Sequence, residues 1–304
     1  MSDYEDVGGF SKQTITREVS ILSIVSHPNI VRFFGTSYHK QNIIIVTEYF
    51  PVDLTKLIGT TKYFVKSIHG RNKKIVFDRK QRRRVLRQII SAVAYLHARS
   101  IIHRDLKAAN VLIDARREDG NFEAKICDFG SAKVVQFDRK KRKNNARRLS
   151  SGSALGEFIG SPLFSPPEAL MVRSSSTSIQ APLLTTISPS SGRESPLLGE
   201  TKNDTMININ DTKENPSFGW DVYSFGVLMY CVTHDCLLPY STVIMKDEQS
   251  LNTAVLNGER PMIDRSKVTE KERMLMEFCW SNEVQNRPHA AKVALTLKEE
   301  SEKE

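Results

Sequence analysis

Two short segments hold the residues of this sequence best suited to chemistry, 103–110 (HRDLKAAN) and 128–130 (DFG). Together they supply the carboxylates of Asp105 and Asp128, the carboxamide of Asn110 and the ammonium group of Lys107. Carboxylate and amide oxygens are hard ligands of the kind that magnesium binds in proteins. A single Asp or Asn is also a common turn cap, because its short side chain bonds to nearby backbone. The wider pattern must decide between these two interpretations.

The elements around the two segments are predicted to be a long helix, a short hairpin and a buried helix. A helix over 79–99 aligns an inward apolar stripe at spacings of four and seven residues: Val85, Ile89 and Leu96. Short elements follow over 101–130, with a hairpin between the two segments. Residues 220–232 are apolar nearly all round, which is typical of a helix buried on every side. This helix is predicted to form the core of the larger of two lobes of the fold.

The first fifty residues predict a helix and a hairpin. Over 14–26, apolar residues recur on one helical face: Ile15, Val19, Leu22 and Val25. Strand-like runs follow at 30–34 and 42–49. The second run contains an unbroken apolar stretch, 43–46 (IIIV), which is typical of a buried strand.

The charge distribution argues against a nucleic-acid binder. The 304-residue chain has a net charge of +9, and the excess lies in two runs, 79–87 and 139–148. Neither run has aromatic residues interleaved for base stacking. The first run is interpreted as the solvated face of a helix and the second as a solvated loop, so no nucleic-acid partner is predicted.

No apolar run approaches the roughly eighteen residues that a membrane span needs, and the first ten residues are acidic and polar. The predicted location is therefore cytoplasmic, with a nuclear location as an alternative. The four cysteines form no C-x-x-C pair and are interpreted as reduced, mainly buried thiols.

The two chemical segments, taken together, resemble the catalytic loop and metal-binding motif of the protein kinase family. Further matches extend to the end of the chain: 27–31 (HPNIV), 161–168 (SPLFSPPE), Asp221, 279–280 (CW) and 287–288 (RP). The last two resemble a signature shared by tyrosine kinases and tyrosine-kinase-like serine/threonine kinases. The resemblance implies an α+β, protein-kinase-like bilobal fold with a mainly helical C-lobe. It also implies a buried ion pair between Glu168 and Arg287.

By this resemblance the reaction is phosphoryl transfer from ATP to a protein substrate, with Mg2+ as the metal. The transition state is loose and anionic, so catalysis consists mostly of positioning and charge neutralisation. Asp105 would orient the substrate hydroxyl, and Lys107 would place its charge on the transferring phosphate. Asn110 and Asp128 would bind magnesium.

The resemblance also assigns the nucleotide pocket. Thr47 would guard its back, and the hinge of Glu48, Tyr49 and Phe50 would bond to adenine through its backbone. Leu112 would lie beneath the adenine ring.

The substrate class and regulation follow from the same resemblance. Lys107 in the catalytic loop and Ser161 in the position of the family's activation-segment threonine favour serine/threonine specificity. Arg104 beside the catalytic aspartate predicts a charge switch, in which phosphate on a nearby serine orders the activation segment. The candidate serines follow the second basic run: Ser150, Ser151 and Ser153.

The sequence departs from the family at its start, where neither the glycine-rich loop nor the strand lysine is found. Glu18 projects within the inward helical stripe, so its carboxylate is predicted to lack the usual lysine partner. Two explanations stay open, an incomplete coding sequence of an active enzyme or a pseudokinase scaffold. Intact Asp105, Asn110 and Asp128 favour the first, and residues 1–304 alone are then expected to be a poor kinase.

The predicted domain organisation has a residual kinase N-lobe over 1–50, with helix αC and two strands, and a C-lobe over 51–304. A stretch dominated by Ser, Thr, Pro, Asn and Gly at about 171–217 is predicted to be a disordered insertion. The sequence indicates neither the protein substrate nor the oligomeric state.

Overall fold

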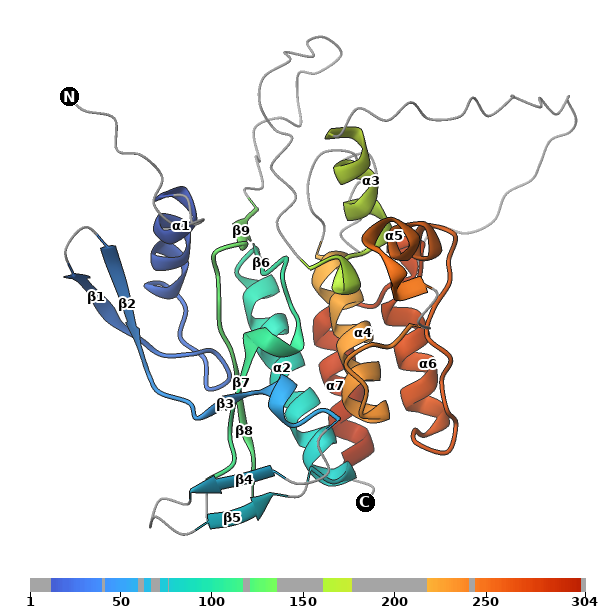
Figure 1. Cartoon of the computed structure of the whole chain (residues 1–304), viewed down its shortest axis with the longest axis horizontal. Helices are drawn as coiled ribbons and strands as arrows, with labels where there is room; N and C mark the ends of the chain where they lie inside the picture. Colours follow the sequence, from blue (N-terminus) through green and yellow to red (C-terminus); the bar gives the residue numbers. More distant parts are fainter. Residues whose placement is uncertain are drawn as a thin grey trace, which may run out of the picture.

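A computed structural model describes residues 12–39, 42–59, 63–66, 72–75, 77–116, 121–135, 161–176, 218–240 and 244–301. In Figure 1, helix α1 and the β1–β2 hairpin lie at one end, a bundle of helices lies at the other, and strands β7 and β8 lie between them. The helices are α1 (Lys12–Leu22), α2 (Arg79–Ala98), α3 (Pro167–Ser176), α4 (Gly219–His234), α5 (Glu248–Leu256), α6 (Glu270–Cys279) and α7 (Ala290–Ser301). The strands are β1 (Phe33–His39), β2 (Asn42–Thr47), β3 (Val52–Asp53), β4 (Tyr63–Lys66), β5 (Asn72–Ile75), β6 (Ile101–Ile102), β7 (Val111–Asp114), β8 (Glu123–Ile126) and β9 (Lys133–Val134).

Helices α2 and α4 form the centre of the bundle, as the apolar patterns predict. Helix α2 begins at an N-cap, because the Asp78 side chain accepts a hydrogen bond from the Gln81 N–H. Its predicted stripe of Val85, Ile89 and Leu96 is buried. Helix α4 is buried along almost its whole length, which confirms the prediction for 220–232.

The β3–β7–β8 sheet places the two chemical segments beside each other. Strand β7 starts directly after Asn110, and β8 ends two residues before Asp128. The strands pair antiparallel, with Val111 opposite Ile126, and the Cys127 N–H donates to the Asn110 carbonyl at 3.0 Å. Both motifs therefore lie at the same end of this hairpin, as the sequence predicts.

The N-terminal elements differ from the prediction in their limits. Helix α1 ends at Leu22 instead of residue 26, and a turn follows. Residues 30 and 31 do not belong to the first strand, because they pair with β8: the Val31 N–H donates to the Ile126 carbonyl at 2.9 Å. Strand β1 therefore begins at Phe33 and forms the predicted hairpin with β2.

Strand β2 corrects a second prediction, because it is not a buried strand. Its side chains alternate between exposed and half-buried, with Ile44 at 44% and Val46 at 39% exposure. An apolar run is buried only where another element covers both of its faces. No described helix or strand covers the Ile44 and Val46 face.

Two further regions differ from the sequence-based prediction. Residues 63–66 and 72–75 form the antiparallel β4–β5 hairpin, which the sequence analysis does not predict. Helix α3 continues to Ser176, so the start of the predicted insertion at residue 171 is placed too early. Several predicted segments lie outside the described residues: Ser150, Ser151, Ser153, the run 139–148 and residues 177–217.

All four cysteines are free thiols, and burial raises the pKa of Cys127, Cys231 and Cys279 to about 12.

Candidate active site

The catalytic loop is anchored on the buried carboxylate of Asp221 in α4. Its two oxygens accept the backbone N–H groups of His103 and Arg104 at 2.9 and 2.8 Å, and the His97 ring nitrogen lies 2.8 Å away. Burial alone would raise the pKa of Asp221, but the hydrogen bonds from His97 and the His103 backbone hold it below its ordinary value. Arg104 adopts a left-handed backbone with φ of 66°. This strained turn is held in place by the two bonds to Asp221.

Asp105 lies at the centre of a cluster of hydrogen-bond donors. Its Oδ2 accepts from Lys107 Nζ at 2.7 Å and from Asn110 Nδ2 at 3.1 Å. Its Oδ1 accepts from the Ser161 N–H at 3.0 Å, and Lys107 Nζ also donates to Ser161 Oγ at 2.9 Å. The carboxylate is 8% exposed and is fixed in one orientation by these donors.

Asp128 lies in a second left-handed turn, with φ of 63°. Its Oδ1 accepts from the Gly130 N–H at 3.2 Å. The neighbouring Phe129 is fully buried against the His103 ring, with the ring centroids 5.1 Å apart. His103 also bonds to the Cys127 carbonyl at 3.1 Å, so the two motifs are tied directly.

The donor set of Asn110 and Asp128 fits a magnesium ion. The Asn110 amide nitrogen is used on the Asp105 carbonyl and carboxylate, at 2.8 and 3.1 Å. The amide oxygen is therefore the atom available as a ligand, together with the Asp128 carboxylate. One carboxylate and one amide oxygen match the preference of magnesium, which keeps several waters and takes substrate phosphates as further ligands.

Glu18 in α1 faces this site. Burial, and to a smaller extent the Asp128 charge, raises the pKa of the Glu18 carboxyl, while a hydrogen bond from the Phe129 backbone partly offsets the shift. No lysine or arginine among the described residues forms an ion pair with Glu18. Its neighbour Arg17 instead donates from Nη1 to the Gly130 carbonyl at 2.9 Å. Helix α1 is thus joined to residues 128–130 through two consecutive side chains.

The predicted hinge follows β2 and connects it to β3. Glu48 is held by three hydrogen bonds: its N–H donates to the Arg32 carbonyl at 2.9 Å, and its carboxylate accepts from the Arg32 N–H and from Lys125 Nζ, each at 2.6 Å. Tyr49 is 72% exposed, and Phe50 lies under the Lys125 ammonium, 5.5 Å from the ring centroid. The hinge is therefore tied to β8 by side chains.

Thr47 and Leu112 lie on the two strands next to the hinge. Thr47 ends β2, and its hydroxyl donates to the Glu48 carbonyl at 3.3 Å. Leu112 lies on β7 opposite Asp53 of β3 and packs partly buried against the core. Within the described residues, neither of the two forms a hydrogen bond to the Asp105 cluster.

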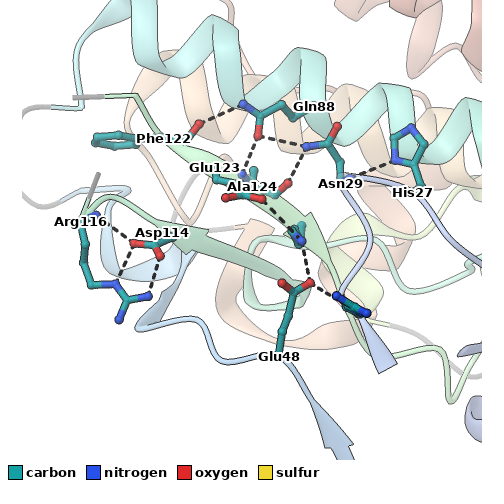
Figure 2. A network of polar contacts seen from close by, with 11 residues as sticks. His27, Asn29, Glu48, Gln88, Asp114, Arg116, Phe122, Glu123 and Ala124 are labelled. Carbon is teal, nitrogen blue, oxygen red and sulfur yellow. Dashed lines mark hydrogen bonds and ion pairs between the residues drawn. The ribbon is translucent and has the colours of Figure 1, made fainter. Parts of the chain in front are cut away.

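A polar network fixes residues 27–29 between α2 and β8 (Figure 2). Asn29 Nδ2 donates to the Ala124 carbonyl at 2.9 Å and to Gln88 Oε1 at 3.2 Å. Gln88 bonds in turn to the Ala124 N–H at 2.6 Å and the Phe122 carbonyl at 2.9 Å. His27 Nδ1 accepts from the Asn29 N–H at 3.0 Å. The loop after α1 is therefore clamped to the same strand that leads to Asp128.

The sequence-based interpretation named Arg104 but missed two further cations beside it, Arg17 and Lys133. Burial and the nearby Arg17 lower the pKa of Arg104 to about 10, and burial with the nearby Arg104 lowers the pKa of Lys133 in β9. Arg104 Nε donates to the Ser131 carbonyl. Arg17 could be suspected from its place beside Glu18, but Lys133 carries no signal in the sequence.

The predicted ion pair of Glu168 and Arg287 is present and bidentate. Arg287 Nη1 and Nη2 donate to the two Glu168 oxygens at 2.6 and 2.9 Å, and the arginine side chain is fully buried. This geometry joins α3, at the end of the activation segment, to the loop before α7.

The fold and this cluster define a protein kinase, and comparison with known sequences agrees. Residues 3–182 match the protein kinase domain family, and residues 211–297 match the protein tyrosine and serine/threonine kinase family. The chain therefore belongs to the protein kinase domain family, and its α+β fold is the one expected for that family. This family generally uses ATP and Mg2+.

Similar curated proteins come from Dictyostelium discoideum. "Probable serine/threonine-protein kinase MARK-C" is 32% identical over 173 residues, which cover 54% of this chain and 18% of that protein. "Probable serine/threonine-protein kinase kinX" is 33% identical over 127 residues, 42% of this chain and 10% of that protein. The chain thus spans less than a fifth of either relative. Among the helices in the described ranges, none combines the length and apolar character required to cross a bilayer.

Proposed function

We propose that this chain is the catalytic part of an ATP-dependent protein serine/threonine kinase. The observation that carries the proposal is the Asp105 carboxylate, held by Lys107, Asn110 and the Ser161 backbone within 3.1 Å. A kinase must orient one hydroxyl in line with a phosphate and neutralise negative charge around it. A fixed carboxylate with an ammonium group 2.7 Å away supplies both needs.

In this proposal Asp105 orients the substrate hydroxyl and accepts its proton as the oxygen attacks the γ-phosphorus of ATP. The bond from that phosphorus to the ADP oxygen breaks, and ADP carries the displaced electron pair. Lys107 stabilises the charge on the transferring phosphate. Asn110 and Asp128 would hold Mg2+, which supplies charge neutralisation on the phosphates when bound.

The nucleotide is proposed to lie between the hinge and β7. Backbone groups of Glu48, Tyr49 and Phe50 would bond to adenine, Leu112 would pack beneath the ring, and Thr47 would limit the back of the pocket. The salt bridge of Glu48 with Lys125 supports this assignment, because it fixes the hinge against the strand that leads to Asp128.

Serine/threonine specificity is supported by two observations. Lys107 donates to both Asp105 and Ser161, so the residue that marks this substrate class joins the catalytic base to the activation segment. The similar curated proteins also carry serine/threonine kinase names. We also propose the domain division at residue 50, with the N-lobe over 1–50, and a cytoplasmic or nuclear location.

The test of this function is transfer of labelled γ-phosphate from ATP to protein substrates by the natural full-length protein, followed by phosphoamino-acid analysis. Label on serine and threonine supports the proposal, and label on tyrosine alone contradicts the specificity. A kinase-like scaffold is the second candidate, because no described cation pairs with Glu18. Binding of magnesium-ATP without any transfer would favour the scaffold.

We further propose that Arg17, Arg104 and Lys133 receive a phosphate on the activation segment. Arg17 lowers the pKa of Arg104, and Arg104 lowers the pKa of Lys133, in addition to the effect of burial, because like charges repel. A phosphate with nearly two negative charges would relieve this repulsion. The candidate acceptors are Ser150, Ser151 and Ser153. Replacing all three by alanine is expected to lower kinase activity at least tenfold, by analogy with other phosphate-ordered loops, with almost no change in melting temperature. Unchanged activity would contradict a switch at these serines.

A further inference from the structure

The Asp105 cluster already holds one hydroxyl group of its own chain, that of Ser161. Lys107 Nζ donates to Ser161 Oγ at 2.9 Å and to Asp105 Oδ2 at 2.7 Å, and the Ser161 N–H donates to Asp105 Oδ1 at 3.0 Å. In the described part of the chain, no other hydroxyl is hydrogen-bonded to Asp105, Lys107 or Asn110. We propose that Ser161 accepts the γ-phosphate of ATP within its own active site, and that the phosphate then blocks this site; the inference rests on the proposed kinase function.

The backbone of Ser161 is fixed, so its hydroxyl stays beside the catalytic loop. In addition to the N–H that is bonded to Asp105, its carbonyl accepts from the Phe164 N–H at 3.0 Å and from Ser165 Oγ at 2.9 Å. Pro162 favours an extended backbone at the residue before it, and Ser161 has φ of −90° and ψ of 121°. Fixed geometry of this kind favours a reaction between two groups of one molecule.

The cluster also provides the two groups that transfer to Ser161 requires. A phosphoryl acceptor needs a base for its proton and positive charge near the transferring phosphate. Asp105 is the proposed base, and the Lys107 ammonium contacts both its carboxylate and the Ser161 hydroxyl. The Lys107 side chain is 26% exposed and Ser161 is partly exposed, so a nucleotide can approach both from solvent.

In the proposed step the Ser161 oxygen attacks the γ-phosphorus of ATP. The bond from Oγ to phosphorus forms while the bond from that phosphorus to the bridging oxygen of ADP breaks, and ADP leaves with the electron pair. The hydroxyl proton passes to the Asp105 carboxylate and from there to solvent. The products are a phosphoserine at this position and ADP.

This product would oppose further turnover. A phosphate carries nearly two negative charges at neutral pH and repels neighbouring carboxylates. Asp105 is largely buried and bonded to the Ser161 N–H, so water and salt would screen this repulsion only weakly. The phosphate would also attract the Lys107 ammonium away from Asp105. Modification at Ser161 is therefore expected to inhibit the kinase, whereas phosphate on the serines of the predicted charge switch is expected to activate it.

Two other serines near the site do not fit as acceptors. Ser165 is buried, and its hydroxyl donates to the Ser161 carbonyl. Ser131 is also buried and directly follows the 128–130 turn. Within the described ranges, neither hydroxyl is hydrogen-bonded to Asp105 or Lys107. The geometry thus favours Ser161 over both neighbours.

The test is autophosphorylation of the natural full-length protein, which is first treated with phosphatase and then incubated with magnesium-ATP. Fragmentation in a mass spectrometer locates the phosphate, and Ser165 serves as the internal control in the same segment. We expect phosphate on Ser161 and none on Ser165, at a rate per molecule that stays constant over about a hundredfold dilution, because the step is intramolecular. The modified protein, separated from the unmodified one, is expected to lose about tenfold or more in turnover of a protein substrate.

Three variants identify the source of the phosphate. Isotope-labelled Asp105→Asn, mixed with active wild type, is expected to stay unmodified at Ser161, because transfer occurs only within one molecule. Ser161→Thr keeps a hydroxyl and is expected to accept phosphate at this position, whereas Ser161→Ala is expected to accept none there. Thermal unfolding of each variant shows whether it is folded.

Several results would overturn the inference. Transfer to a protein substrate with no phosphate on Ser161 would do so and would leave the proposed function intact. Phosphate on Ser161 of the labelled Asp105→Asn chain would also do so, since another molecule would then be the donor. Unchanged turnover of the modified protein would contradict the predicted block. Absence of transfer to any protein, this chain included, would contradict the proposed function as well.

Discussion

Two of the antiparallel hairpins in the described residues, β1–β2 and β7–β8, differ in their surroundings. The β7–β8 hairpin is covered by α2, and Ile126 at its end is fully buried. In the β1–β2 hairpin, Ile44 is 44% exposed, although the sequence of β2 is more apolar than that of β8. The proposed metal-binding residues Asn110 and Asp128 flank the buried hairpin, while the proposed hinge follows the exposed one. The proposed phosphoryl-transfer site is thus attached to the more enclosed of the two hairpins, and the proposed nucleotide contacts to the less enclosed one.

The two hairpins are linked by few polar contacts. The Lys125 ammonium of β8 bonds to Glu48 at the end of β2, and Val31 pairs with Ile126 just before β1 begins. We therefore expect the buried hairpin to be stable without this link and the exposed hairpin to depend on it. Three predictions test the difference, from the largest expected effect to the smallest.

The first prediction compares one isoleucine from each hairpin. Ile126→Ala is expected to lower the free energy of unfolding by about 2 to 5 kcal/mol, because it leaves a cavity in a packed interior. Ile44→Ala is expected to lower it by about 0.5 kcal/mol, since its side chain is partly in water already. Urea unfolding of the two variants and wild type measures both values. Equal losses would mean that the β1–β2 hairpin is covered as fully as β7–β8.

The second prediction concerns the link between the hairpins. Lys125→Met is expected to destabilise the protein by about 1 to 2 kcal/mol, because Glu48 stays largely buried and loses its cation. The matched control is Arg116→Met, which breaks a local pair with Asp114 on β7 and is expected to cost about 0.5 kcal/mol. A double-mutant cycle with Glu48→Gln isolates the coupling. A coupling near zero would show that the hairpins are not joined through this pair.

The third prediction is a pH dependence at Glu18, with an expected effect below about 1 kcal/mol because the side chain is partly solvated. Folding raises the pKa of the Glu18 carboxyl above its ordinary value of 4.5. The contribution of Glu18 to stability is therefore fully present below pH 4.5 and is lost as the pH rises through the folded-state pKa. Glu18→Gln should therefore gain stability relative to wild type as pH rises above 4.5. The control Glu270→Gln should show the opposite trend, because the hydrogen bond from Arg273 lowers the pKa of Glu270. A flat difference for Glu18→Gln would place that carboxyl in solvent.

The sequence predicts which residues of the proposed site lie together better than it predicts burial. Asp105, Lys107 and Asn110 share one loop, and pairing of two short strands brings Asp128 beside them, so local pattern suffices. Burial of 43–46 could not be predicted, because it depends on which element covers each face. The charged strand Glu123–Ile126 shows the reverse case, since α2 covers it and Glu48 neutralises its lysine. Lys133 and the pairing of residues 30–31 with β8 depend likewise on contacts between distant segments.

The central claim is that Asp105 acts on the substrate hydroxyl while Asp128 and Asn110 hold the metal-bound nucleotide. It is tested most directly by measuring turnover and magnesium-ATP affinity of Asp105→Asn in the natural full-length protein, with Asp128→Asn and, as a control on β7, Asp114→Asn alongside. Asp105→Asn is expected to lose about 10²- to 10⁴-fold in kcat with nearly unchanged ATP affinity. Asp128→Asn should instead weaken magnesium-ATP binding, and Asp114→Asn should change neither. Near-normal turnover of Asp105→Asn would contradict the assignment of the catalytic loop.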